Sequence, residues 1–104
     1  MRNTNFEMKK YVLSEGVNAY KYGKVVFVSI FENFATGISS GEYILSEDII
    51  PVDTVRAILY GSPFGSGADV YLPMWCAQDS HSLLWGTSGQ VITSLRGFIT
   101  YLCK

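Results

Sequence analysis

A run of ten residues at positions 22–31 constrains the fold more than any other part of the chain. After Lys24 it holds three valines, one isoleucine and two phenylalanines within seven positions. Such an unbroken apolar run is typical of a β-strand that is buried on both faces. Because side chains alternate along a strand, we expect one face to carry Val25, Phe27, Ser29 and Phe31, and the other to carry Val26, Val28 and Ile30. We therefore expect a second sheet over one face, and a further layer of the domain or another copy of the chain over the other.

The balance of apolar and charged residues points to self-association. The 104 residues make one domain with one core. Hydrophobic residues make up 48% of the chain and charged residues only 16%, whereas about a quarter is usual for charged residues. A small domain with so little charge is expected to cover part of its surface with a partner. A closed homo-oligomer is the simplest form of such a partner.

The charge pattern argues against two classes of partner. The net charge is −1, and the basic residues are scattered apart from Lys9 and Lys10, so we expect no nucleic-acid binding. The chain has no apolar run of about 18 residues, so we expect no membrane insertion. Its first residues lack the apolar core of a signal peptide, which predicts a protein that is not classically secreted. Cys76 and Cys103 are therefore interpreted as small buried apolar side chains rather than a disulfide.

The rest of the chain has the pattern of short strands separated by turns. Residues 1–10 are predicted to be a polar arm, and residues 11–104 a single domain. The predicted strands are 10–14, 17–22, 53–61, 68–76, 82–85, 90–94 and 97–103, in addition to the apolar run, and apolar character also returns at 42–45. Glycine-rich loops are predicted at 35–41 and 61–67, and a tight glycine turn at 86–89 makes a hairpin of its two flanking strands.

Two positions in this pattern leave alternatives. Residues 53–61 also fit a helix with Asp53 as its N-cap, but we predict a strand because every neighbouring segment is β. Pro73 lies within a strand and predicts an edge strand or a bulge. The fold class is therefore all-β, an antiparallel β-sandwich or jelly-roll-like domain of seven to eight short strands.

Four aromatic residues and the polar residues near them are the candidates for ligand binding. Sugars stack apolar C–H faces on aromatic rings, while acids and amides bind their hydroxyls, and loops on a rigid scaffold commonly carry such sites. The candidate saccharide-binding residues are Tyr60, Asp69, Tyr71, Trp75, Gln78, Asp79, His81 and Trp85. The alternative for both tryptophans is burial in the core or in a subunit interface.

Three segments resemble catalytic or metal-binding motifs, but none has the structural context that its chemistry requires. Residues 37–41 fit the G-x-S-x-G pattern of a hydrolase, but that mechanism needs a strand-to-helix turn that the surrounding sequence does not predict. Residues 61–67 resemble a phosphate loop but are followed by a strand pattern rather than a helix. Asp79 and His81 are too few ligands for a metal site. We expect no enzymatic activity, no metal and no cofactor.

The order of these features is similar to that in the C-terminal β-sandwich domains of bacteriophage and prophage tail proteins, namely tail fibres and receptor-binding proteins. Those domains commonly open with a y-G-k-v-V strand, which residues 22–26 match. They continue with an L-P-e-g-y-r-P segment, of which Leu45, Glu47 and Pro51 match three places. Ser46 and Asp48 depart from its first proline and its glycine. A final hairpin turns at d-G, where this chain has Ser88 and Gly89.

The resemblance implies a function and an assembly that the residues alone do not indicate. It implies a virion component of the distal tail, or a protein of the bacterial cytoplasm when expressed from a prophage. Such proteins usually form homotrimers, contact other tail proteins and contribute to recognition of a host cell-wall saccharide. A purely structural trimerisation or capping module of a tail fibre, and a carbohydrate-binding domain of a bacterial protein, are the alternatives.

Overall fold

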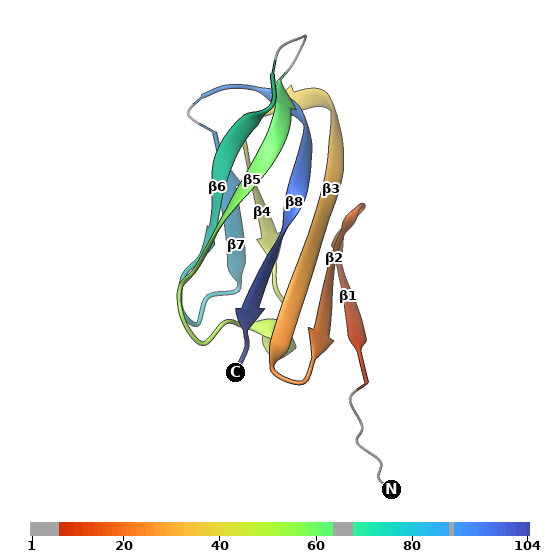
Figure 1. The fold of residues 1–104 in the computed structure, drawn as a ribbon, viewed down its shortest axis with the longest axis vertical. Helices are drawn as coiled ribbons and strands as arrows, with labels where there is room; N and C mark the ends of the chain where they lie inside the picture. The colour runs from red at the N-terminus through yellow and green to blue at the C-terminus, as the bar shows by residue number, and fades with distance from the viewer. Residues whose placement is uncertain (1–6, 64–67, 88) are drawn as a thin grey trace, which may run out of the picture.

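The computed structural model describes residues 7–63, 68–87 and 89–104, and these form one antiparallel sheet of eight strands (Figure 1). In chain order the elements are β1 (Lys9–Ser14), β2 (Val17–Tyr22), β3 (Val25–Ile38), β4 (Ser40–Ile44), a short 3₁₀ helix η1 (Glu47–Ile49), β5 (Val55–Pro63), β6 (Val70–Cys76), β7 (Ser82–Gly86) and β8 (Ile92–Leu102). The strand order in the sheet is β1-β2-β3-β8-β5-β6-β7-β4. The all-β prediction is confirmed, and so is the strand at 53–61, which the structure begins at Val55.

The sheet curls on itself until it is nearly closed, so that its inner face becomes the core. In Figure 1, β4 and β7 lie behind β5 and β8, and the two edge strands, β1 and β4, approach each other. Alternate residues of the strands point inward, and in β8 this alternation shifts at Ser94 and Leu95, which are both buried. The largest fully buried side chains include Trp85, Leu59, Leu72, Met74 and Val28. Cys76 and Cys103 are both free thiols inside this core, as their apolar interpretation predicts.

The long strand β3 has one buried face and one exposed face. Val26 and Val28 are fully buried and Ile30 is 2% exposed, so the predicted grouping of these three side chains on one face is confirmed, and this face points into the core. The opposite face is not covered by the domain itself, because Phe27 remains 39% exposed and Phe31 58% exposed. The apolar run therefore packs against one layer within the chain and leaves its second apolar face in contact with solvent.

The predicted loop at 35–41 is wrong. Strand β3 continues to Ile38, which pairs with Ile92 of β8 beyond an irregularity that begins after Asn33. The chain then bends at Ser39 and enters β4 at once. Small polar residues suggested a loop, but Ile38 pairs with β8, and Ser40 and Gly41 pair with β7. The register is irregular between Asn33 and Ile38, where Gly37 has a φ of 77°.

The predicted hairpin around residues 86–89 is also wrong. Strand β7 pairs with β4 and β6, whereas β8 lies between β3 and β5. In the order of the sheet, β5 and β6 lie between β7 and β8, so these consecutive strands are not neighbours. Residues 90–94 and 97–103 were predicted as two strands, but most of both belong to β8, which contains Gly97 at a φ of 148°. A side chain at Gly97 would lie 2.5 Å from Leu59, so glycine allows Leu59 to pack there.

Pro73 does not mark an edge strand, because β6 lies inside the sheet between β5 and β7. The ladder between β6 and β7 consists of Met74 opposite Trp85 and Trp75 opposite Leu84. Pro73 lies just outside that ladder and faces Ile58 of β5 in register. Proline has no backbone N–H, and Pro73 lies at a position of β6 that is not paired with β7, so the ladder between β6 and β7 does not need that N–H. Of the predicted arm, Lys9 and Lys10 belong to β1, and residues 1–6 lie outside the described ranges.

Candidate functional site

The eight predicted saccharide-binding residues do not meet in one place. Tyr60, Tyr71 and Trp75 lie on the outer face of the neighbouring strands β5 and β6. Asp69 accepts a hydrogen bond from the Ser62 hydroxyl at 3.1 Å, near the end of the molecule where β5 and β6 are joined (Figure 1). Gln78, Asp79 and His81 lie between β6 and β7 at the other end, and Trp85 is in the core.

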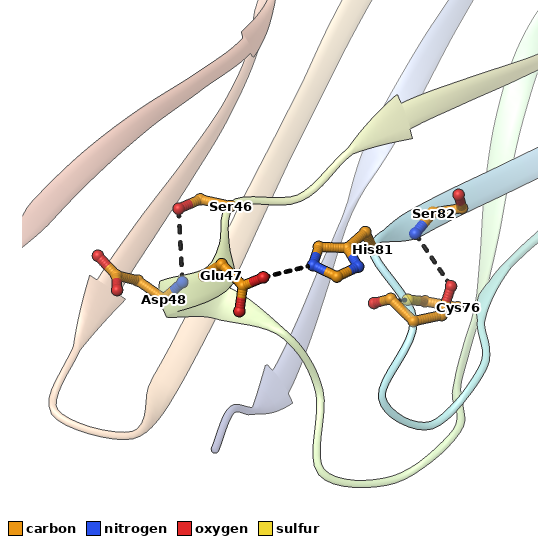
Figure 2. A network of polar contacts seen from close by, with 7 residues as sticks. Ser46, Glu47, Asp48, Cys76, His81 and Ser82 are labelled. Atoms are coloured by element: carbon orange, nitrogen blue, oxygen red, sulfur yellow. Dashed lines mark hydrogen bonds and ion pairs between the residues drawn. The ribbon is translucent and has the colours of Figure 1, made fainter.

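The polar residues between β6 and β7 are engaged in contacts within the chain. His81 Nε2 is 3.0 Å from Glu47 Oε1. Figure 2 shows this contact between η1 and the residue that directly precedes β7. Asp79 pairs with Lys104 at 2.6 Å, and the backbone N–H of Gln78 donates to Thr54 Oγ1 at 3.3 Å. These contacts connect the segment between β6 and β7 to the segment that precedes β5 and to Lys104 beyond β8, which is a structural role.

A row of four side chains runs across the outer face from β3 to β6. Phe31 faces Arg96 in register, Arg96 faces Tyr60, and Tyr60 faces Tyr71. The Arg96 guanidinium lies 5.5 Å from the centre of the Phe31 ring, a cation–π distance. The rings of Tyr60 and Tyr71 meet edge to face with centroids 6.5 Å apart. Cross-strand pairing thus groups residues from four strands.

This row belongs to a larger surface, which we call the outer aromatic face. It covers the outward side of β2, β3, β8, β5 and β6. Phe27 and Phe98 stack in its middle with ring centroids 5.4 Å apart. Its nine large apolar residues, all at least 39% exposed, are Tyr22, Val25, Phe27, Phe31, Ile58, Tyr60, Tyr71, Phe98 and Leu102. The charged side chains at the described outward positions of these five strands are Arg56 and Arg96.

A second candidate site lies at the seam between β1 and β4, where the sheet is not closed. We call it the seam cavity. It has a volume of about 180 Å³ and its lining includes Ser14 of β1, Glu32 and Phe34 of β3, Tyr43 of β4 and Trp85 of β7. Trp85 is 2% exposed and stacks on Phe34 with ring centroids 5.7 Å apart. The Trp85 ring therefore cannot stack on a ligand at the outer surface. A ligand could contact it only from within the seam cavity.

The polar centre of the seam cavity is the carboxylate of Glu32. The Tyr43 hydroxyl donates to Oε1 at 2.5 Å, and the Ser14 hydroxyl donates to Oε2 at 3.0 Å. Burial and the hydrogen bond to Glu32 raise the pKa of Tyr43 well above its ordinary value. Tyr43 therefore stays a neutral donor at physiological pH.

The indole N–H of Trp85 lies close enough to Tyr43 to oppose part of that rise in pKa, yet it makes no hydrogen bond within the described chain. A Cβ at Gly41, another residue of the cavity wall, would lie only 2.4 Å from this nitrogen. A buried donor without a partner costs about 1–3 kcal/mol. The wall of the seam cavity thus holds one polar group whose hydrogen-bonding capacity is unused.

The residues of the seam cavity were missed from the sequence, although one signal was present. Glu32 continues the inward alternation of Val26, Val28 and Ile30, so a charged residue stands in the core register of a buried strand. The outer aromatic face had a similar signal in Phe98 and Leu102, which alternate with the buried Ile99 and Tyr101. The Glu32 signal becomes visible only when the strand is extended past residue 31, whereas Phe98 and Leu102 already lie within the predicted strand 97–103.

No family model, curated protein or solved structure matches this chain. In the described ranges, no helix has the length and apolar character needed to cross a membrane. Nor do three or more His, Cys, Asp or Glu side chains of these ranges gather as a metal site would require. The fold therefore defines the class of protein, an all-β domain of one nearly closed antiparallel sheet.

Proposed function

We propose that the chain is a structural and recognition module of a bacteriophage or prophage tail. In this proposal it assembles as a homotrimer through the outer aromatic face and contributes to binding of a host-surface saccharide. The observation that carries the assembly is the exposure of that face. The tail context rests on the resemblance of residues 22–26, Leu45, Glu47 and Pro51 to tail-protein domains.

The size of the outer aromatic face supports a macromolecular partner. With roughly 200 Å² for each fully exposed large side chain, its nine residues expose on the order of 1,000 Å² of surface together. The largest apolar patch on a typical monomer is only about 300–600 Å². A standard protein–protein interface buries about 800 Å² on each partner. One copy of the face is therefore large enough to form such an interface.

The shape and charge of the face favour another copy of the chain as its occupant. Its described outward charges are Arg56 and Arg96, and Arg96 lies over the Phe31 ring, so most of the area that association would cover is uncharged. Two apolar hollows of about 300 Å³ lie on it, one around Met8, Tyr20 and Phe27 and the other around Ile58 and Trp75. Exposed rings of a neighbouring copy can fill such hollows, as anchor residues do at interfaces.

Sedimentation of the full chain at micromolar concentration tests this assembly. We expect a trimer for the native sequence and a shift toward monomer for Phe98→Thr, because this change removes a central ring while keeping a residue suited to strands. Ile44→Thr on β4 is the matched control, since Ile44 is 61% exposed and Phe98 is 63% exposed, and it should leave the trimer intact. A native chain that sediments as a monomer would contradict the proposal.

A purely structural capping module is the second candidate function. It is favoured by the ion pairs of Asp79 with Lys104 and of His81 with Glu47, which engage two of the predicted ligand-binding side chains within the chain. A glycan array with the purified chain separates the two functions. Binding that falls on Tyr71→Ala supports recognition at the margin of the outer aromatic face, where Tyr71 is 79% exposed. A trimer that binds no glycan supports the capping module.

A further inference from the structure

The seam cavity contains a carboxylate that has no cation as a partner. Each oxygen of Glu32 accepts one hydroxyl, from Tyr43 or from Ser14, although a carboxylate can accept about four hydrogen bonds. No described Lys, Arg or His forms an ion pair with it. Glu42 also lines the seam cavity, and none of the lining residues is basic. The site is therefore negative and favours a cationic ligand.

The other walls specify a ligand that is more than a bare cation. The Phe34 and Trp85 rings supply apolar surface, and aromatic rings attract ammonium groups as well as C–H faces. The unpartnered indole N–H of Trp85 calls for an acceptor such as a hydroxyl. The volume of about 180 Å³ is close to that of a cavity of ~150 Å³ that holds benzene. The cavity can therefore hold the ring of a six-membered sugar, and the substituents of that ring extend through the side where the sheet is not closed.

We propose that the seam cavity binds an amino sugar, whose primary ammonium pairs with Glu32 and whose ring lies against Phe34 beside Trp85. The ammonium replaces the missing cation, and a ring hydroxyl is the acceptor that the indole N–H lacks. This proposal deepens the saccharide recognition proposed above by naming the class of sugar. It assigns that recognition to the inner edge of the sheet rather than to the outer aromatic face.

Tryptophan fluorescence of the full chain measures this binding directly. The Trp75→Phe variant leaves Trp85 as the reporter, because the chain has two tryptophans. D-glucosamine is the probe, and glucose and N-acetylglucosamine are the controls, since they have the same ring without the charge. We expect a saturable change with glucosamine and an affinity at least about tenfold lower for the two neutral sugars, the effect of one charged hydrogen bond.

Two substitutions locate the site on the cavity wall. Glu32→Gln keeps the shape and removes the charge, and should weaken glucosamine binding about tenfold or more. Asp53→Asn removes one charge from an exposed carboxylate outside the cavity wall and should have no effect. Glu42→Gln, at an exposed position, gives a second reading if Glu32→Gln lowers the melting temperature, and we expect a smaller loss in the same direction.

Several results would overturn the proposal. These are the absence of a saturable response to glucosamine, equal affinity for all three sugars, and unchanged binding in Glu32→Gln. The same response to calcium chloride alone would indicate a metal site instead and would also overturn it. Sedimentation of the same samples reports the trimer separately. Failure of sugar binding and failure of the proposed assembly are therefore distinguished.

Discussion

The Tyr43 hydroxyl donates a 2.5 Å hydrogen bond to Oε1 of Glu32 and thereby connects β4 to β3 across the interior. These strands follow each other in the chain, but four others lie between them in the order of the sheet. Because Ser14 of β1 donates to the other oxygen, one carboxylate joins three strands around the seam. The edges of the sheet are therefore held by side chains where backbone pairing ends.

Removing the Tyr43 hydroxyl is expected to loosen the seam. Tyr43→Phe leaves Glu32 with Ser14 alone and should lower the free energy of unfolding by about 1.5–3 kcal/mol, the range for hydrogen bonds to charged groups. Urea unfolding measures the change. Tyr11→Phe is the control, because the Tyr11 hydroxyl donates to the exposed Asp48 at 3.1 Å and its loss should cost less than about 1 kcal/mol. Equal losses in the two variants would contradict the role of the Glu32 contact.

The packing of Trp85 against the backbone predicts a second sensitive position. A Cβ at Gly41 would lie 2.4 Å from the Trp85 indole nitrogen, whereas a Cβ at Gly86 would have its nearest contact at 3.7 Å. Gly41→Ala should therefore destabilise the fold by about 1–3 kcal/mol through overpacking, and should also change the fluorescence of Trp85. Gly86→Ala is expected to be nearly neutral. Thermal unfolding of both variants checks the difference, and a stable Gly41→Ala would show that Trp85 can move aside.

Strand β3 shows how much of the fold could be predicted from the sequence. The alternation in residues 22–31 predicts which side chains of β3 share a face, because successive side chains of a strand point to opposite sides. It does not tell whether the other face is covered, since a strand that meets a second copy of the chain has the same composition as one buried within a domain. The structure shows that this other face is not covered within the domain, because Phe27 and Phe31 remain exposed.

Strand partners were harder to predict than strands. The glycines at 86 and 89 suggested a local hairpin, but β8 pairs with β3 and β5, which are distant in sequence. Pairing at such distances depends on matching inward faces, and no short motif encodes it. The seam cavity was missed for the same reason, because Ser14, Glu32 and Tyr43 meet only after the whole sheet has formed.

Alkaline pH is expected to destabilise the protein through two buried tyrosines. Burial raises the pKa of Tyr43, as does its hydrogen bond to Glu32, and burial also raises the pKa of Tyr101, whose hydroxyl donates to the Ile49 carbonyl at 2.7 Å. The folded state therefore holds these protons more tightly than the unfolded state. The stability that these two tyrosines contribute is fully present below about pH 10, the ordinary tyrosine pKa. It falls above that pH by up to about 1.4 kcal/mol per pH unit for each tyrosine.

Urea unfolding between pH 9 and pH 11 (on the order of one unit either side of the ordinary tyrosine pKa) measures this loss. Tyr43→Phe should show a shallower decline than the native sequence, because one of the two protons is gone. Tyr71→Phe is the control, since Tyr71 is exposed and its removal should leave the slope unchanged. Stability that stays constant over this range would show that the phenolates are accommodated in the folded state.

Both cysteines are expected to resist modification in the folded protein. Cys76 is fully buried and Cys103 is 2% exposed. Burial raises the pKa of the Cys76 thiol, while the Ser80 side chain acts in the opposite direction. The thiol also donates to the Ser80 carbonyl at 3.5 Å. The thiolate is the reactive form, so labelling with a disulfide reagent should follow the rate of unfolding. In urea both thiols should react at once. Fast labelling of the native chain would contradict this, and Cys103→Ala would identify the thiol responsible.

The place of β8 has a consequence for the order in which the protein is assembled during synthesis. Seven strands precede β8 in the chain, yet β3 and β5 are joined in the sheet only through it. Until β8 leaves the ribosome, the nascent chain can form two blocks, β1-β2-β3 and β5-β6-β7-β4, that share no backbone ladder. Such distant pairing slows folding and prolongs exposure of the inner faces. Pulsed hydrogen exchange during refolding should show amides of β3 and β5 on the β8 side becoming protected together with those of β8.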